Sequence, residues 1–154
     1  MMTDIPHPIN AAFSIVFLTT PLPLPENSKE QRITLEWRLI PYLSLQENIL
    51  LGVEKKNSKN TELLQQLTQQ FNLEKTFLKT QEQLTSFERV KLQFLHSLLL
   101  QKQKIYFDNV CSAFSIRETQ EFLHLCQKIA KTHNLAILLT TTDPSLIKTK
   151  LDTH

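Results

Sequence analysis

The sequence predicts an α/β fold, with a parallel β-sheet core and a block of helices in the middle of the chain. In the second half, a strand pattern at 104–110, a helix pattern after 115 and a strand pattern at 135–141 follow one another. This strand–helix–strand order is typical of parallel strands joined by a right-handed crossover. Between 44 and 100, apolar residues recur at helical spacing, so we expect that block to be helical.

Two strand candidates lie near the N-terminus. Phe13–Thr19 is a short apolar run rich in residues that favour strands, so we expect a buried strand there. Gln31–Trp37 alternates more weakly and is the second candidate. Between them, the proline-rich segment Thr20–Pro25 can form neither a helix nor a central strand. We expect it to be an extended connector, although the spacing of its prolines would also suit an aromatic groove on another protein.

The middle block contains three candidate helices. Ser44–Glu47 has the residues of a capping box, in which two side chains bond to each other's free backbone N–H groups, and the helix that it begins should end at Gly52. After a polar loop at 53–60, Glu62–Phe71 carries its apolar residues on one helical face. Thr85–Glu88 is a second capping box and begins the third helix.

The last third of the chain contains the predicted crossover. Lys104–Val110 and Leu135–Thr141 are apolar runs with the composition of buried strands. Between them, Ser115–Glu118 is a third capping box and begins an amphipathic helix. Asp143 and Pro144 follow the second strand and predict a turn or the start of a helix.

The composition excludes two kinds of binding site. The chain has 154 residues and a single glycine, Gly52, whereas loops that cradle phosphates on backbone N–H groups need several glycines. The sequence therefore contains no self-contained phosphate-binding loop and no dinucleotide fingerprint. Its 17 basic and 15 acidic residues are too nearly balanced for nucleic-acid binding by bulk charge.

Other features indicate a reducing, cytoplasmic environment. The apolar runs are too short to cross a bilayer, and Met1–Asn10 lacks the basic region of a signal peptide, so we expect neither a membrane span nor a leader. Cys111 and Cys126 lie in apolar surroundings without the spacing of metal ligands. We expect them to be buried, reduced thiols.

Four segments, read in order, resemble motifs of the nucleotide-binding domain of ABC transporters. The first resembles the stretch L-x-P-x-L-S-V-x-E-N-I-x-x-G that follows the family's Q-loop, and the second resembles the signature L-S-G-G-E-x-Q-R. The third resembles Walker B with the D-loop, and the fourth resembles the switch strand. These segments are Leu39–Gly52, Leu84–Lys91, Lys104–Ser115 and Ala136–Pro144.

The resemblance implies a truncated P-loop NTPase-like fold in one degenerate domain over residues 1–154, with a helical subdomain beside the sheet. Within it, 13–43 would form the N-terminal strands and a loop, and 44–100 the helical subdomain. Residues 101–154 would form the core from Walker B to the switch strand. The family's glycine-rich Walker A loop and its lysine have no counterpart in the sequence.

Residues on which hydrolysis depends in this family are replaced here. The resemblance implies that Asp108 keeps the place of the aspartate that supports Mg²⁺, but Asn109 stands where a glutamate orients the attacking water. An amide cannot act as a general base. Thr142 stands at the switch histidine and Leu35 near the Q-loop glutamine. We therefore expect no cofactor and no metal. If Asp108 is not a metal ligand, we expect it to be a strand-end carboxylate that bonds to Ser112, Asn109 or nearby backbone N–H groups.

The signature segment also departs from the family pattern. Its remnant comprises Thr85, Ser86, Phe87 and Glu88, with Ser86 and Phe87 in place of two glycines. In the family this motif closes over a nucleotide held by the opposite subunit, so we expect Phe87 to obstruct that approach. In addition, Ser115 replaces the aspartate of the D-loop.

These replacements predict a pseudo-ATPase that acts by binding a protein, rather than an enzyme. In ABC proteins the segment after the Q-loop forms a groove for a helix of the membrane subunit, and this chain keeps that segment best. The resemblance therefore implies binding to a transporter's membrane subunit or to another nucleotide-binding domain, with a dimer as one form. Such a protein would be cytoplasmic, and peripheral at the inner face of the cell membrane only through its partner.

The residues predicted to contact the partner are Arg38, Tyr42, Glu47 and Asn48. Trp37 and Tyr42 are either core residues or anchors for the partner. Two other functions stay open at this point. One is a half-site of a heterodimeric ATPase, in which this chain contributes its signature region to ATP bound by a partner. The other is a free-standing regulatory interaction protein.

Overall fold

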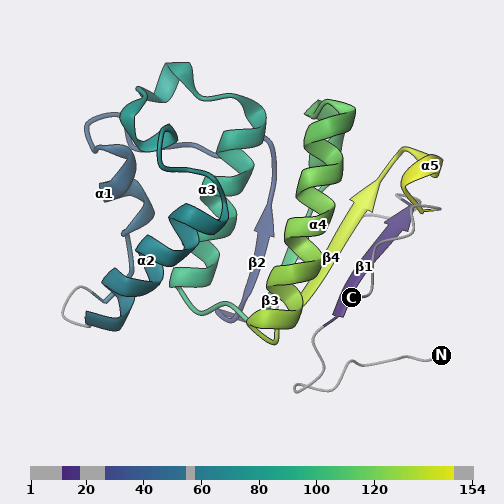
Figure 1. Ribbon diagram of the computed structural model, residues 1–154, viewed down its shortest axis with the longest axis horizontal. Coiled ribbons are helices and arrows are strands. Elements are labelled where there is room, and N and C mark those ends of the chain that lie inside the picture. The colour runs from purple at the N-terminus through teal and green to yellow at the C-terminus, as the bar shows by residue number, and fades with distance from the viewer. Residues whose placement is uncertain (1–11, 18–26, 55–57, 148–154) are drawn as a thin grey trace. The chain divides into compact units, whose positions relative to one another are not determined.

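The computed structural model describes residues 12–17, 27–54 and 58–147 (Figure 1). Its strands are β1 (Ala12–Phe17), β2 (Glu30–Ile33), β3 (Lys104–Phe107) and β4 (Ala136–Thr141). Its α-helices are α1 (Leu45–Ile49), α2 (Ser58–Gln70), α3 (Ser86–Leu99), α4 (Ile116–Thr132) and α5 (Pro144–Ile147). Its 3₁₀ helices are η1 (Thr76–Leu78), η2 (Gln81–Gln83) and η3 (Val110–Ala113). None of the described helices is both long enough and apolar enough to span a bilayer.

The described residues fall into two compact units. The first, called the sheet unit below, comprises the described residues up to Thr34 and from Lys102 onward, and it contains the four strands with η3, α4 and α5. The second, called the helical unit, comprises Leu35–Gln101 and contains α1, α2 and α3 with η1 and η2.

The sheet unit is built on four parallel strands in the order β1-β4-β3-β2. β3 and β4 are direct neighbours and are joined by α4, so the predicted parallel crossover is confirmed. In register, Ile105 lies opposite Ile137 and Phe107 opposite Leu139. Because side chains alternate along a strand, these four apolar residues share one face of the sheet.

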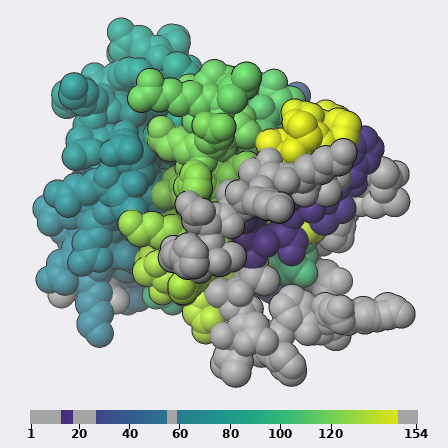
Figure 2. All heavy atoms as spheres, turned by 45° about the vertical axis from the view of Figure 1, so that its right-hand side comes forward, coloured from purple at the N-terminus to yellow at the C-terminus, as the bar shows by residue number. Residues whose placement is uncertain are grey.

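That apolar face is covered by α4, which packs against β1 and β4 (Figure 1). The rings of Phe107 and Phe122 meet edge to face, with centroids 4.9 Å apart, and Phe114 lies against the same Phe122 ring. Full burial of a side chain such as Phe107 or Phe122 contributes roughly 2 kcal/mol. At the edge of the sheet, α5 lies against β1, as the yellow and purple segments of Figure 2 show.

In the helical unit, α3 is the central element and packs against both α1 and α2. The rings of Phe71 and Phe94 join α2's end to α3, with centroids 5.1 Å apart. The first helix ends at Ile49, with Leu50 as its C-terminal cap, before the predicted Gly52. Gly52 itself adopts φ +78°, a left-handed conformation that glycine tolerates best. A β-carbon at this position would also lie 3.3 Å from Leu100.

All three predicted capping boxes are present. Each pairs a Ser or Thr before the helix with a Glu three residues later, and each side chain accepts the other residue's backbone N–H. The pairs are Ser44 with Glu47, Thr85 with Glu88, and Ser115 with Glu118. Because this motif depends only on residues three apart, it can be read directly from sequence.

Other element boundaries also differ from the prediction. β2 is Glu30–Ile33 rather than 31–37, because its partner β3 ends at Phe107, opposite Ile33. β3 itself ends there because Asn109 turns into the left-handed region. α2 begins at Ser58, inside the predicted loop 53–60. The predicted connector Thr20–Pro25 lies outside the described residues.

Candidate functional site

The carboxyl ends of β3 and β4 bring together several of the predicted site residues in the sheet unit. Asp108 and Asn109 follow β3, and Thr142 and Asp143 follow β4. The two strands are parallel neighbours, so these residues emerge at the same edge of the sheet. In parallel α/β sheets, ligands commonly bind at this edge.

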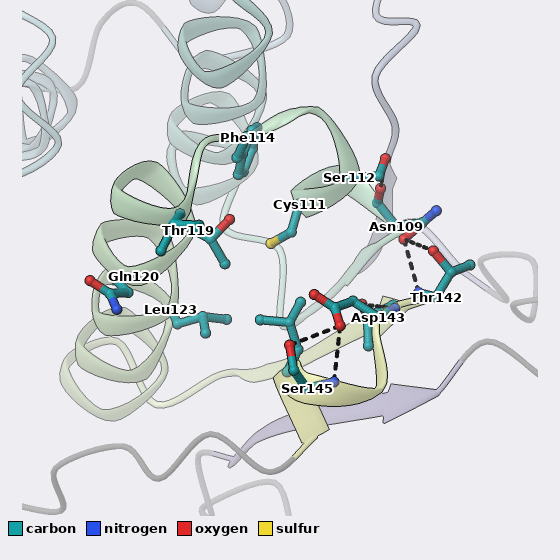
Figure 3. A pocket seen from close by; sticks show the side chains of 13 residues that line it. Asn109, Cys111, Ser112, Phe114, Thr119, Gln120, Leu123, Thr142, Asp143 and Ser145 are labelled. Atoms are coloured by element: carbon teal, nitrogen blue, oxygen red, sulfur yellow. Dashed lines mark hydrogen bonds between the residues drawn. The ribbon is translucent and has the colours of Figure 1, made fainter.

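Asn109 and Thr142, the two predicted degenerate positions in this unit, contact each other directly. The side-chain oxygen of Asn109 accepts a hydrogen bond from the Thr142 backbone N–H at 3.2 Å and from its hydroxyl at 3.5 Å (Figure 3). The backbone N–H of Asn109 donates to the Thr140 hydroxyl at 3.0 Å. Asn109 has φ 50° and ψ 35°, a left-handed conformation that asparagine adopts more readily than most residues. This asparagine therefore ties the ends of two strands together.

Asp108 is held by an ion pair rather than by the groups we expected. Its carboxylate accepts a hydrogen bond from the Arg32 guanidinium at 2.5 Å, and its backbone N–H donates to Ile33 at 2.9 Å. Both charged side chains are partly exposed. The predicted bond to Ser112 is wrong, since that hydroxyl donates to the Asn109 carbonyl instead. Asp108 stays a strand-end carboxylate, but its partner comes from β2.

The residues around Asp108 do not fit the Mg²⁺ that the sequence resemblance implies. A divalent cation needs carboxylate or carbonyl ligands, and the Asp108 carboxylate is already paired with Arg32. Within residues 12–17, 27–54 and 58–147, no three His, Cys, Asp or Glu side chains are grouped so that they could hold a metal ion. The Nε atom of Arg32 is buried and makes no hydrogen bond to any described group.

A cavity of about 380 Å³ opens beside these strand ends, entirely within the sheet unit. Side chains from η3 and its flanking residues, from the first turns of α4, and from the end of β4 through α5 surround it (Figure 3). The lining residues are Asn109, Cys111, Ser112, Phe114, Ile116, Thr119, Gln120, Leu123, Thr141, Thr142, Asp143, Ser145 and Leu146. This set contains one carboxylate and neither lysine nor arginine, whereas sites that transfer phosphoryl groups need cationic groups.

The titratable groups of this cavity, with the neighbouring Cys126, do not form a nucleophilic site. Burial raises the pKa of the Cys111 thiol to about 12 and that of Cys126 well above its ordinary value, so neither is a thiolate at neutral pH. Both cysteines are free and buried, as predicted. Hydrogen bonds from the hydroxyl and the backbone N–H of Ser145 lower the pKa of Asp143, which is therefore ionised at neutral pH.

In the helical unit, the signature remnant forms a closed hydrogen-bonded cluster at the start of α3. Glu88 accepts hydrogen bonds from the Lys79 ammonium at 2.8 and 2.9 Å, from the Thr76 hydroxyl at 2.8 Å and from the Thr85 backbone at 2.9 Å. Burial on its own would raise the pKa of Glu88, but these hydrogen bonds outweigh it and lower the pKa to about 2. The cluster stabilises this helix end.

The two residues that replace the signature glycines point in different directions. Ser86 is exposed at the first position of α3. Phe87 is buried, and its ring lies 4.4 Å from the Lys91 ammonium, itself a buried group that donates to the Phe71 carbonyl. The Phe87 side chain is therefore turned into the interior, and the obstruction that we predicted from it is wrong.

The predicted partner-contact residues also divide into exposed and buried ones. Tyr42 is 86% exposed, and Arg38 and Glu47 are exposed as well. Asn48, by contrast, is only 2% exposed, so the prediction that it contacts a partner is wrong. Trp37 is half-buried, with its ring 6.4 Å from that of His96.

Asn48 instead fixes the loop that carries Tyr42. Its side-chain oxygen accepts the Ile40 backbone N–H at 2.8 Å. Its side-chain nitrogen donates to the Ile40 and Leu43 carbonyls at 3.3 Å and to the Ser44 carbonyl at 2.9 Å. The Gln81 amide donates to the same two carbonyls, of Ile40 and Leu43, at 2.9 and 3.3 Å. Two amides thus hold both ends of the loop.

Sequence reasoning missed Arg32 and Gln81, since each bonds across a long stretch of chain. Arg32 pairs with a residue 76 positions away, and Gln81 with one 41 positions away. Leu35, the remaining predicted position, is half-buried in the turn after β2. Its aliphatic side chain can neither coordinate a metal nor form a hydrogen bond.

The sequence matches no protein-family model and no curated protein. Solved structures, however, share its fold. The dimeric structure of MJ0796, a bacterial ABC transporter cassette, superposes with a TM-score of 0.60 at 16% identity, over 78% of this chain and 56% of that chain. The fold is that of an ATP-binding cassette. The predicted α/β fold class, with its parallel sheet, is thereby confirmed.

Two further cassette structures give the same result. An inward-facing ABC transporter superposes with a TM-score of 0.62 at 17% identity, over 77% of this chain and 50% of that chain. The third is cbiO1 from Clostridium perfringens, part of the ABC transporter complex cbiONQ, with a TM-score of 0.63 at 12% identity. It is matched over 75% of this chain and 47% of its own. This chain thus spans about half the length of the cassettes that it resembles.

Proposed function

We propose that this chain is a catalytically inactive ATPase-like subunit of an ABC transporter system, and that it acts by binding another protein. The single observation that carries the proposal is the presentation of Tyr42, which is 86% exposed on a loop fixed by the Asn48 and Gln81 amides. An exposed large aromatic side chain on a rigid loop is what a binding hot spot needs.

Three features of the sheet unit support the loss of catalysis. The Asp108 carboxylate is paired with Arg32, and the Asn109 amide is bonded to Thr142. The adjoining cavity offers no cationic side chain to a phosphate. A residue that could act as the general base in hydrolysis is missing at Asn109, because an amide does not accept a proton at neutral pH.

The partner that fits this proposal is the membrane subunit of a transporter, with another nucleotide-binding domain as the second possibility. The cassettes of similar fold include one described as a dimer and one described as part of a transporter complex. Tyr42 lies in the segment that resembles the family's groove for the membrane subunit, so its loop is the expected contact surface.

Replacement of Tyr42 by alanine is expected to weaken binding to the cognate membrane subunit about tenfold or more, because the aromatic anchor is lost. The measurement is binding of the purified chain to that subunit in nanodiscs by biolayer interferometry. Leu78→Ala is the matched control, because Leu78 is also 86% exposed in the helical unit but lies in η1, outside the fixed loop. Equal effects of the two variants would contradict the proposal.

Calorimetry is expected to detect no ATP binding at millimolar nucleotide, with or without Mg²⁺. The reason is that the cavity offers no cationic side chain to a triphosphate and that Arg32 is already paired with the Asp108 carboxylate. A complete cassette titrated in the same buffer is the positive control. A saturable heat of binding for this chain would contradict the proposal that it is catalytically inactive. It would not bear on protein binding, which the Tyr42→Ala variant tests.

A composite ATPase is the second candidate, favoured by one observation. Because the Phe87 side chain is buried and Ser86 is exposed, the start of α3 is not blocked by an aromatic ring. ATPase activity that arises only when this chain is mixed with a complete cassette would support this candidate over the first.

A further inference from the structure

The cavity at the ends of β3 and β4 has the size of a small-molecule site. Its volume of about 380 Å³ lies within the range of ligand pockets, roughly 300–1,000 Å³. It is also larger than the roughly 150 Å³ that suffices for benzene in an apolar cavity. Tyr42 is not among the residues that line it.

One side of the cavity is mainly apolar. Phe114, which follows η3, and Leu123 of α4 line it, and Figure 3 shows both on the side formed by η3 and α4. Ile116, at the first position of α4, lines the same cavity and is 81% exposed. An aliphatic side chain so exposed beside a cavity adds apolar surface that a ligand can cover.

The opposite side is polar and carries a single charge. The Oδ1 atom of Asp143 accepts the backbone N–H and the hydroxyl of Ser145 at 2.9 and 2.8 Å, and no described residue bonds to Oδ2. On the side formed by α4, the Thr119 hydroxyl likewise makes no hydrogen bond to a described residue, and Figure 3 shows Thr119 across the cavity from Asp143. With an ionised carboxylate and no lysine or arginine, the lining attracts cations and repels anions.

We propose that this cavity binds a small organic cation, a primary amine attached to an apolar, aromatic body. The ammonium group donates to the Asp143 carboxylate, a charge-assisted hydrogen bond of the stronger kind. The aromatic body lies against Phe114 and Leu123, where ring contacts and apolar burial stabilise it.

A pair of probes with matched shape and opposite charge tests the proposal. Benzylammonium and benzoate are titrated separately into the full chain, and binding is followed by ligand-observed NMR. Benzylammonium is expected to bind with Kd on the order of 1 mM, as a ligand of this size allows, and benzoate at least about tenfold more weakly. Asp143→Asn keeps an oxygen for Ser145 but removes the charge, and is expected to weaken benzylammonium about tenfold.

Glu74→Gln is the control variant, because it removes an exposed carboxylate of the helical unit that does not line the cavity. It is expected to leave the affinity for benzylammonium unchanged. Equal binding of the two probes, no saturation by benzylammonium at about 50 mM, or equal effects of the two variants would each overturn the proposal. If Asp143→Asn fails to fold, the two probes decide the matter on the unaltered chain.

Discussion

Replacement of Asn48 by alanine is expected to lower the free energy of unfolding by about 3 kcal/mol. Asn48 is 2% exposed and makes four side-chain hydrogen bonds, all to the backbone of residues 40–44. Alanine would leave the Ile40 N–H without a described partner and would remove one donor from each of three carbonyls, which keep the Leu43 N–H, the Gln81 amide or the residue-48 N–H. Each buried polar group left unsatisfied costs about 1–3 kcal/mol, partly relieved where water or Gln81 reaches it.

The measurement is urea unfolding followed by circular dichroism. Gln46→Ala is the matched control, since Gln46 is an amide on the same helix α1 but is exposed. It is expected to change stability by less than about 0.5 kcal/mol. A loss for Asn48→Ala no larger than that of Gln46→Ala would show that water replaces the amide, and that the Tyr42 loop is not fixed as described.

Asn48 also illustrates how a local motif can be read correctly while its surroundings cannot. The capping box of Ser44 and Glu47 was predictable because both partners lie within one helical turn. The position of Asn48 one residue later gave no sign of burial, because burial depends on which loop folds over it. The bonds from Gln81 to Ile40 and Leu43 close that loop from 38 positions away or more.

In the sheet unit, too, some contacts could be predicted from the sequence and others could not. Strand patterns and the helix between them predicted parallel neighbours β3 and β4, and parallel neighbours place Asn109 and Thr142 at one edge. Their contact is therefore a consequence of the predicted topology. The ion pair of Arg32 with Asp108 is not, because nothing in the weak pattern at 31–37 fixes which residue of β2 lies beside the end of β3.

The cavity could not be predicted from the sequence at all. Its lining comes from three segments, and only Asn109 and Thr142 among its residues had been singled out as site positions. Asp143 was expected to form a turn, which it does through Ser145. That turn leaves one carboxylate oxygen without a described partner, and this feature depends on side-chain geometry rather than on residue type.

Stability that depends on Glu88 is expected to be lost between about pH 4.5 and pH 2. The pKa of Glu88 falls from 4.5 to about 2 on folding, so this group stabilises the folded state fully above pH 4.5. As the pH falls through this window the carboxylate is protonated and its bonds to Lys79, Thr76 and Thr85 weaken. The side chain is only 14% exposed, so screening is limited, and the lowered pKa corresponds to about 3 kcal/mol.

The test compares the unaltered chain with Glu88→Gln in urea titrations from about pH 7 to pH 2. Glutamine resembles the protonated acid, so the difference in unfolding free energy should be about 3 kcal/mol near pH 7 and should vanish near pH 2. Glu82→Gln, an exposed acid in η2 of the same unit, is the control and should show no such trend. A difference for Glu88→Gln that stays constant across this range would mean that its effect comes from packing rather than from charge, and that Lys79 does not hold the start of α3.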